Sequence, residues 1–218
     1  MKKVCIDCGH GGSDCGAIGV NNYYEKDYTL KLGKRIVELL GNYSVEIITT
    51  RNNDSYVSLN DRVKKSNNNN CDIFVSIHCN AHSNTAANGF ETYSYNGNSD
   101  LQKLTHKNIL NRIPSLKDRG LKKASYYVLK YTKATAVLIE CGFITNESDY
   151  KILLDNIDNF ALSICQSIVL FLGLKQIDNR EIYRVVVGSY TVKENAQNML
   201  KQLEKEGYKP FIFKATIW

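Results

Sequence analysis

The stretch Val4-Cys5-Ile6-Asp7-Cys8-Gly9-His10-Gly11-Gly12 decides how this chain is expected to fold. A short, mostly apolar strand runs directly into a glycine-rich turn that carries one of only four histidines. Glycine adopts backbone conformations that other residues resist, so backbone and imidazole can approach another group closely at this turn. Two later stretches follow the same plan, in which an apolar strand ends in polar residues: Ser76-Ile77-His78-Cys79-Asn80-Ala81 and Val137-Leu138-Ile139-Glu140-Cys141-Gly142-Phe143.

The composition is that of an ordinary globular protein. Its 218 residues are enough for one full-sized domain with a small addition. Hydrophobic residues make up 43% and charged residues 23%, and no apolar run is long enough to cross a bilayer. The formal net charge of +6 favours an anionic partner, and nucleic acid, teichoic acid and an acidic membrane surface all meet that condition.

The seven cysteines do not predict a disulfide framework, because their number is odd and the chain is too large to need cross-links. Several lie inside apolar segments, where a reduced thiol packs as a small hydrophobic group. Cys5 and Cys8 form a C-x-x-C pair, but residues three apart on a strand point to opposite faces. No second pair completes a cysteine-rich zinc site.

The N-terminus lacks the pattern of a secretory signal. Two lysines follow Met1, but neither an apolar core nor a small-residue cleavage site comes after them. We therefore expect synthesis in the cytoplasm, with any target outside the cell membrane reached by another route.

Apolar segments and helical periodicities alternate over the first 173 residues. Strands are predicted from Val4 onward and at residues 45–49, 72–78, 89–95, 126–130 and 135–140. Helices are predicted at residues 28–40, 58–65, 101–113, from 146 onward, and at 157–171. This order predicts an α/β fold, with a twisted, mostly parallel central sheet of about six strands and helices on both of its faces.

The pattern restarts near the C-terminus. The first domain is predicted at residues 1–174, followed by a polar linker at 175–181 and a small β-α-β unit at 182–218. That unit is expected to hold strands at residues 183–187 and 211–213 around a helix at 193–206. About forty residues is near the lower limit for independent folding, so this unit is expected to lean on the first domain or on a second copy of itself.

The chemistry is expected where the strands end. His10, His78 and Glu140 each lie at or just after the carboxyl end of an apolar strand, where reactive residues gather in α/β sheets, and Glu25 begins the helix after the His10 loop. Two histidines and a carboxylate are the three-ligand set of a hydrolytic zinc site, and a second carboxylate, Glu140, would accept a proton from water. The other histidines are expected to be unremarkable, with His82 in a loop and His106 on a helix surface.

These residues resemble the zinc-dependent N-acetylmuramoyl-L-alanine amidases of bacterial cell walls and phage endolysins. The resemblance covers residues 1 to about 173 in the family's order. It rests on these stretches: Ile6-Asp7-Cys8-Gly9-His10-Gly11-Gly12, Glu25-Lys26-Asp27, Thr50-Arg51 with Asp54, Leu59 and Arg62, Asp72-Ile73-Phe74-Val75-Ser76-Ile77-His78-Cys79-Asn80-Ala81, and Glu140-Cys141-Gly142-Phe143-Ile144-Thr145-Asn146.

The resemblance implies that His10, Glu25 and His78 bind one Zn²⁺ per catalytic domain, that Glu140 is the catalytic glutamate, and that Asn80 contacts substrate. The bond cleaved would be the amide between N-acetylmuramic acid and the L-alanine of the stem peptide. Glu25 at a helix N-terminus has a simpler interpretation as well, since an acidic residue there favours the helix dipole. For Arg62 and Asp54, an ion pair that holds the loop is the simpler expectation.

The C-terminal unit is similar to half of a SPOR-type peptidoglycan-binding domain, through Val187-Gly188-Ser189-Tyr190, Ala196, Leu203 and Gly207-Tyr208. A full domain of that type has two β-α-β halves, and this chain carries one. The unit is thus expected to bind the cell wall, including its anionic polymers, or to pair with a second chain as a homodimer.

The leading hypothesis is therefore a peptidoglycan hydrolase, either a phage endolysin or a lysis-linked autolysin that reaches the wall after a holin-type release. One alternative is a wall-binding module with an inactive enzyme domain, which the intact His10, Glu25, His78 and Glu140 disfavour. Another is a basic nucleic-acid-binding protein. It is disfavoured because residues 183–188 lack the aromatic signature of an RNA-binding sheet.

Overall fold

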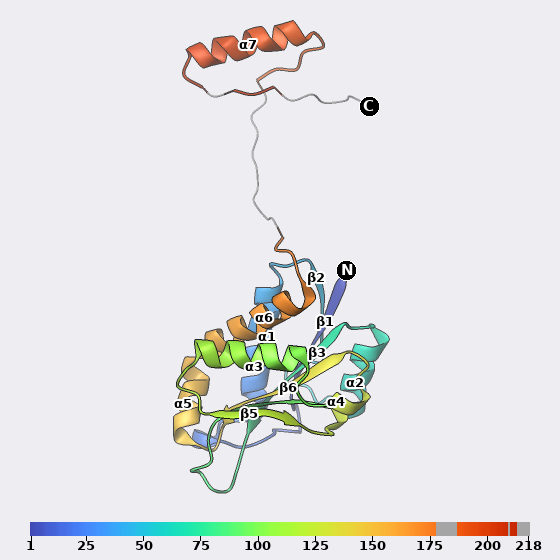
Figure 1. Ribbon diagram of the computed structural model, residues 1–218, viewed down its shortest axis with the longest axis vertical. Coiled ribbons are helices and arrows are strands. Elements are labelled where there is room, and N and C mark those ends of the chain that lie inside the picture. The colour runs from blue at the N-terminus through green and yellow to red at the C-terminus, as the bar shows by residue number, and fades with distance from the viewer. Residues whose placement is uncertain (178–186, 209, 213–218) are drawn as a thin grey trace. The chain divides into compact units, whose positions relative to one another are not determined.

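The computed structural model describes residues 1–177, 187–208 and 210–212. The chain divides into two compact units, residues 1–177 and 178–218. The elements of the first unit (Figure 1) are β1 Lys2–Cys8, a 3-10 turn Val20–Asn22, α1 Glu25–Leu40, β2 Val45–Thr49, α2 Leu59–Asn68, β3 Ile73–Asn80, β4 Phe90–Ser94, α3 Asp100–Arg112, β5 Asp118–Lys123, α4 Tyr127–Tyr131, β6 Thr135–Phe143, α5 Glu147–Asp155 and α6 Ile157–Leu172.

The sheet has six strands in the order β2-β1-β3-β6-β4-β5. Strands β2, β1, β3 and β6 are parallel, whereas β4 runs antiparallel to β6 and parallel to β5. The central strands are apolar along most of their length because they are covered on both faces, as Ile73, Phe74 and Val75 of β3 show with at most 1% exposure. The predicted mostly parallel α/β fold is confirmed.

Helices cover both faces of this sheet. The larger core packs Val4 and Ile6 of β1 against Ile36 of α1, Leu101 of α3 and Ile164 of α6. In Figure 1, α3 and α6 run alongside each other, and they pack together. A smaller core on the other face joins buried residues of α2 and α4 to the sheet: Cys5, Ile48, Val63, Cys71, Phe74, Val128, Leu129 and Leu138.

The two cysteines of the C-x-x-C pair lie in different cores. Cys5 packs in the smaller core and Cys8 in the larger one. This is the alternation expected for residues three apart on a strand. All seven cysteines are free thiols.

One predicted strand is wrong, and one strand was not predicted. Residues 126–130 were expected to be a strand because they are aromatic and β-branched, yet Tyr127–Tyr131 is the helix α4. Val128 and Leu129 are both buried in the same core, and adjacent residues of a strand cannot share a face. The sheet is completed instead by the polar edge strand β5, Asp118–Lys123, whose sequence carries no apolar alternation.

The sequence predicted His106 on a helix surface, but the structure places it in the interior. The residue is 4% exposed, and its ring contacts residues of both β4 and β5. One ring nitrogen, Nδ1, is 3.0 Å from Thr92 Oγ1, and the other, Nε2, is 2.9 Å from Asp118 Oδ1. The buried face of α3 therefore carries polar as well as apolar side chains, and His106 links β4 to β5.

The carboxylate of Asp7 joins four segments of the first unit. Its Oδ1 accepts hydrogen bonds from Arg62 Nη1 at 2.7 Å and Thr50 Oγ1 at 2.8 Å, and its Oδ2 accepts one from Ser76 Oγ at 2.7 Å. Arg62 therefore does form the expected buried ion pair, but its partner is Asp7. Asp54, the other residue expected in an ion pair, pairs with Lys26 at 2.7 Å.

Among the described residues, no single helix is long and apolar enough to cross a bilayer. The helices α5 and α6 together have sufficient length and apolar character, but they are bent by 68° relative to each other. The apolar face of α6 is used in the larger core, where Phe160, Ile164 and Ile168 are fully buried.

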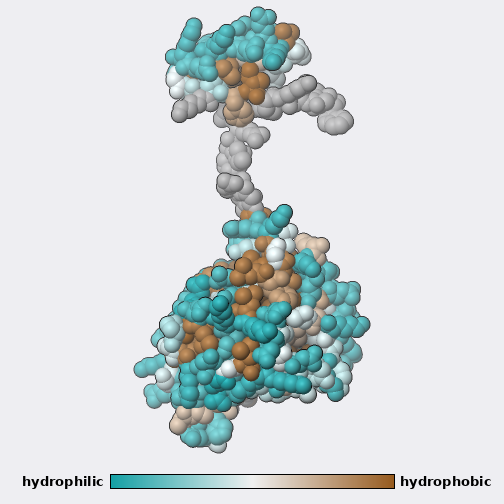
Figure 2. Space-filling view, in the orientation of Figure 1, coloured by the Kyte–Doolittle hydropathy of each residue, from teal (hydrophilic) through white to brown (hydrophobic). Residues whose placement is uncertain are grey.

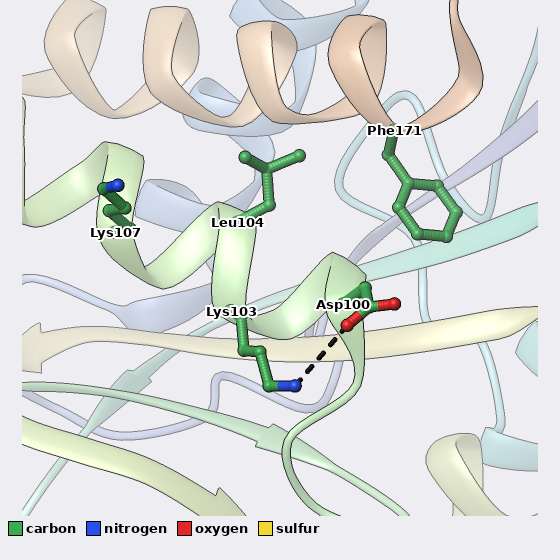
Figure 3. Close-up of a pocket in the computed structure, with 5 residues that line it drawn as sticks. All are labelled: Asp100, Lys103, Leu104, Lys107 and Phe171. Carbon is green, nitrogen blue, oxygen red and sulfur yellow. Dashed lines mark hydrogen bonds and ion pairs between the residues drawn. The ribbon is translucent and has the colours of Figure 1, made fainter.

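The surface over α3 and α6 carries an open hollow of about 360 Å³. Figure 2 shows apolar side chains gathered among hydrophilic ones on this face. The hollow is lined by Leu104 and Phe171 together with three charged residues of α3, and its Asp100 and Lys103 form an ion pair at 3.4 Å (Figure 3).

The second unit contains the helix α7, Lys193–Lys205, which confirms the predicted helix. Of the two strands predicted beside it, only Val187, Phe211 and Ile212 lie within the described residues, and none of these three is part of a strand. The remainder of both predicted strands lies outside the described residues.

We expect Asp7→Ala to lower the free energy of unfolding by about 3–5 kcal/mol, because it leaves the buried guanidinium of Arg62 without its counter-charge. Urea unfolding followed by circular dichroism measures this change. Asp158→Ala is the control, since it removes the exposed ion pair with Arg35 and should change little. Equal losses in the two variants would contradict the role given to Asp7.

Candidate active site

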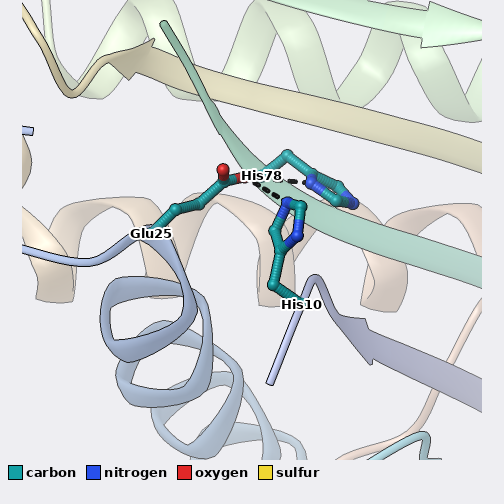
Figure 4. A group of neighbouring side chains, drawn as sticks. All are labelled: His10, Glu25 and His78. Carbon is teal, nitrogen blue, oxygen red and sulfur yellow. Dashed lines mark hydrogen bonds and ion pairs between the residues drawn. The ribbon is translucent and has the colours of Figure 1, made fainter. Parts of the chain in front are cut away.

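Three side chains from distant parts of the chain meet at the carboxyl ends of the inner strands β1 and β3 (Figure 4). His10 lies in the loop after β1, Glu25 is the first residue of α1, and His78 lies near the end of β3. His10 Nε2 is 3.1 Å and His78 Nδ1 is 3.0 Å from the same oxygen, Glu25 Oε1. The two imidazole rings stand nearly perpendicular, with their centroids 5.0 Å apart.

Glycines on either side of His10 leave room for this convergence. A Cβ atom on Gly9 would lie 2.4 Å from Cε1 of His78, and one on Gly16 would lie 2.7 Å from Glu25 Oε2 and from His10 Cδ2. His10 itself has a φ of 61°, a left-handed conformation that costs energy for a residue with a Cβ. The sequence indicated a close approach at this turn, and the group that approaches is another side chain of the site.

Glu25 is the buried centre of the group, with 4% of its surface exposed. Besides the two histidines, backbone N–H groups hold its carboxylate: Cys79 donates to Oε1 and Ala17 to Oε2, each at 2.9 Å. Burial alone would raise the pKa of Glu25, but the hydrogen bonds with His10 and His78 outweigh it and keep the pKa well below its usual value. The carboxylate is therefore charged.

The histidines respond in the opposite direction. Burial disfavours a charged imidazole, but the hydrogen bond with Glu25 and its charge raise the pKa of His78 to about 9, and the pKa of His10 is raised for the same reasons. Both shifts favour protonated imidazoles, so a metal ion must compete with protons for these nitrogens.

Asp14 was not singled out from the sequence. Its Oδ2 lies 2.9 Å from His10 Nδ1, the ring nitrogen that faces away from Glu25. A carboxylate in this position fixes the ring orientation and the tautomer of a metal-binding histidine. The signal was present, because Asp14 is the one acidic residue between His10 and Glu25.

The residues present fit a zinc ion. The nitrogens of His10 and His78 and one carboxylate oxygen of Glu25 all lie within 4.8 Å of one another. Ligand atoms around a tetrahedral zinc with bonds of 2.0–2.1 Å are about 3.3 Å apart, close to the two nitrogen–oxygen distances of the cluster. Two imidazoles and one carboxylate are also the ligand set that hydrolytic zinc sites use. Asp14 supplies the further carboxylate that such sites place on the second ring nitrogen of a zinc-binding histidine.

Glu140 lies on β6, the strand next to β3, and is in register with His78. Its Oε2 is buried and has no hydrogen-bond partner among the described residues. Burial raises the pKa of Glu140 to about 7, against the opposing charge of His78. A carboxylate with this pKa can both accept and release a proton near neutral pH.

Asn80 lies two residues beyond His78 on β3, past a shift in the strand register. Its Nδ2 donates to Glu91 Oε1 at 2.7 Å, and its Oδ1 accepts from the backbone N–H of Ala81 at 2.9 Å. Glu91 is 2% exposed and stands directly opposite Glu140 on the antiparallel strand β4. Sequence analysis did not single out Glu91, because no local pattern distinguishes it from other strand residues.

The family model for N-acetylmuramoyl-L-alanine amidases matches residues 4–169, which include all of the residues described above. The chain belongs to this family. Its activity is hydrolysis of a peptidoglycan amide. A SPOR domain model also matches, over residues 133–214, and its first part overlaps β6, α5 and α6 of the amidase unit.

Known relatives agree with this assignment. The sporulation-specific N-acetylmuramoyl-L-alanine amidase of Bacillus subtilis (strain 168) is 35% identical over 216 residues, which are 95% of this chain and 83% of that protein. The endolysin of Bacillus phage SPP1 is 40% identical over 161 residues, which are 70% of this chain and 58% of that protein. The structure of the amidase AmiC2 of Nostoc punctiforme superposes with a TM-score of 0.76 at 35% identity, covering 79% of this chain and 97% of that one.

We expect Gly16→Ala to weaken zinc binding by about tenfold or more, because its Cβ displaces Glu25 and His10. Gly173→Ala is the matched control. Gly173 has a φ of 62°, close to the 65° of Gly16, but no atom lies within 4 Å of its added Cβ. Both variants should lose similar stability from backbone strain, and only Gly16→Ala should lose zinc in a competition with a chromogenic chelator. Equal zinc affinities would contradict this account of the turn.

Proposed function

We propose that this amidase is zinc-dependent and cleaves the amide between N-acetylmuramic acid and the L-alanine of the stem peptide. In this proposal His10, Glu25 and His78 hold the ion and Glu140 is the catalytic acid and base. The observation that supports it most is the convergence of two imidazole nitrogens and a carboxylate oxygen within 4.8 Å, one strand away from a buried carboxylate oxygen without a partner.

The chain's own residues divide the work of hydrolysis. When bound, the zinc ion supplies a Lewis acid that polarises the amide carbonyl and acidifies water. Glu140 accepts the proton of the attacking water as the carbon–oxygen bond forms. It then returns that proton to the amide nitrogen, so that the carbon–nitrogen bond breaks and L-alanine leaves with a free amino group. A pKa of about 7 suits both halves of this transfer.

Asn80 stays a predicted substrate contact. The hydrogen bonds to Glu91 and to Ala81 each engage one side of its amide, so one N–H of Nδ2 and one lone pair of Oδ1 are left for a ligand. The bond to Glu91 fixes the side chain at the carboxyl end of β3, close to His78.

The biological role we propose is lysis of the cell wall, as an autolysin or an endolysin. The similarity to the sporulation-specific amidase extends over 95% of this chain, whereas the similarity to the phage endolysin covers 70%. This difference favours the autolysin, because a match over 95% of the chain includes most of the second unit. The same reaction serves either role.

We further propose that the second unit binds peptidoglycan, which its match to the SPOR model supports. Pairing of two such units into a homodimer stays a prediction. Sedimentation velocity on the full chain tests it, and a single monomeric species at micromolar concentration would contradict the pairing.

We expect Glu140→Gln to lower turnover by about 10²–10⁴-fold while leaving one zinc bound per chain, because the substitution removes the proton acceptor and leaves the three metal-binding residues in place. His78→Ala should lose both turnover and zinc. The assay is the release of new L-alanine amino termini from purified peptidoglycan, with and without a chelator. Glu147→Gln, at an exposed carboxylate on α5, is the control and should match the unmodified chain.

Two outcomes would contradict this proposal. An active enzyme that a chelator does not inhibit would exclude the zinc assignment. Loss of zinc from Glu140→Gln would make Glu140 a metal ligand instead of the base.

A further inference from the structure

Two cations lie on the far side of Glu91 from Glu140. Arg119 and Lys122 belong to the edge strand β5, and both contact the same carboxylate oxygen, Glu91 Oε2, with Arg119 Nε at 2.8 Å. Residues three apart on a regular strand point to opposite faces. Here the register with β4 shifts and Gly120 has a φ of 85°, so a bulge turns both cations to one side.

Both cations lie close to aromatic rings. The guanidinium of Arg119 lies 4.8 Å from the ring centroid of Phe143, and Nζ of Lys122 lies 5.9 Å from that of Tyr93. Such contacts attract a cation to the ring face and limit its freedom. Phe143 follows Glu140 by three residues on β6, so Arg119 packs on the strand that carries the proposed base.

The cations provide more positive charge than Glu91 needs. Glu91 is 2% exposed and also accepts hydrogen bonds from Asn80 and from the hydroxyl of Tyr93, so four donors share its two oxygens. The side chains of Arg119 and Lys122 are 31% and 35% exposed. One carboxylate between two cations leaves a local charge of +1 that solvent can reach.

Donors remain free on this pair. Among the described residues, Nη2 of Arg119 has no acceptor, and Lys122 Nζ is bonded only to Glu91. A guanidinium edge beside an ammonium group is suited to a carboxylate, which accepts two charge-assisted hydrogen bonds.

The pair lies within reach of a peptide bound at the site. His78, Glu140 and Glu91 stand side by side on β3, β6 and β4, and β5 follows β4. Neighbouring strands are about 4.8 Å apart, so β5 lies about 14 Å from β3. An extended peptide advances about 3.3–3.6 Å per residue. The long side chains of Arg119 and Lys122 shorten the distance between β5 and the scissile amide. The two cations can therefore reach the second or third residue of a stem peptide.

We propose that Arg119 and Lys122, held on Glu91, form a subsite for a free carboxylate of the stem peptide. This subsite rests on the proposed function for the position of the scissile bond. It makes the amidase selective for stem peptides whose carboxylate is free over those in which it is amidated.

The test compares substrates that differ by one charge. One pair of muramyl peptides carries D-glutamate or D-isoglutamine as the second residue, and the other carries diaminopimelate or its amide as the third. We expect kcat/KM to be about 10- to 100-fold higher for the free carboxylate in one of these pairs, which identifies the residue bound. Equal values within both pairs would overturn the proposal.

Variants of β5 assign the preference to this pair. Lys122→Gln should lower the ratio of kcat/KM between the free carboxylate and its amide at least several-fold, and Lys122→Arg should preserve this ratio. Lys123→Gln, the exposed neighbour in sequence, is the matched control and should leave it unchanged. If the cations serve only to satisfy Glu91, Lys122→Gln would lower the melting temperature and reduce turnover of both members of each pair alike, and this result would overturn the proposal.

A binding measurement separates this proposal from the proposed function. Calorimetric titration of the full chain with L-alanyl-D-glutamate and L-alanyl-D-isoglutamine peptides measures selectivity without turnover, and a third-residue pair is titrated in the same way. If the peptides with a free carboxylate bind more tightly than the amidated ones, but the chain does not cleave peptidoglycan at L-alanine, the subsite is supported and the proposed reaction is rejected. Cleavage at L-alanine without selectivity in binding or in kcat/KM would support the reaction and reject the subsite.

Discussion

The charged carboxylate of Glu25 is the interaction on which this site depends. Burying a carboxylate is costly unless hydrogen bonds replace its water, and here two backbone N–H groups and two imidazoles do so. Those donors come from the loop after β1, the loop before α1 and the end of β3. One buried charge therefore fixes the relative positions of His10 and His78. The same contacts keep the carboxylate ionised and available to a cation.

The sequence was most informative where burial is complete. Strands β1, β3 and β6 are apolar because helices cover both of their faces, so their positions and their polar ends could be predicted. The edge of the sheet could not be predicted in this way. Strand β5 has hydrogen-bonding partners on one side only and a polar sequence, whereas α4 resembles a strand in composition and is a helix because Val128 and Leu129 both enter one core.

The same distinction applies to the site. His10, Glu25, His78 and Glu140 could be predicted as site residues from their places at strand and helix ends and from the family resemblance. Glu91 and its partners on β5 were missed because they depend on the register of β4 with two neighbours and on a bulge at Gly120. A bulge changes which side chains share a face without leaving a signal in the hydrophobic pattern. Long-range pairing of this kind can be seen only in the fold.

The β5 cations also bear on the proton affinity of Glu140. Two carboxylates directly opposite each other on paired strands repel, and Glu91 raises the pKa of Glu140 through its charge. Burial is the largest cause of the shift of this pKa to about 7, and the charges of Glu25 and Glu91 add to it. Arg119 and Lys122 both pair with Glu91 on its other side. Without this pair, the charge of Glu91 would be uncompensated, so we expect a larger fraction of Glu140 to be protonated at neutral pH and less of it to be available to accept a proton. The two cations proposed to bind substrate therefore also offset the charge of the carboxylate that stands opposite the proposed base.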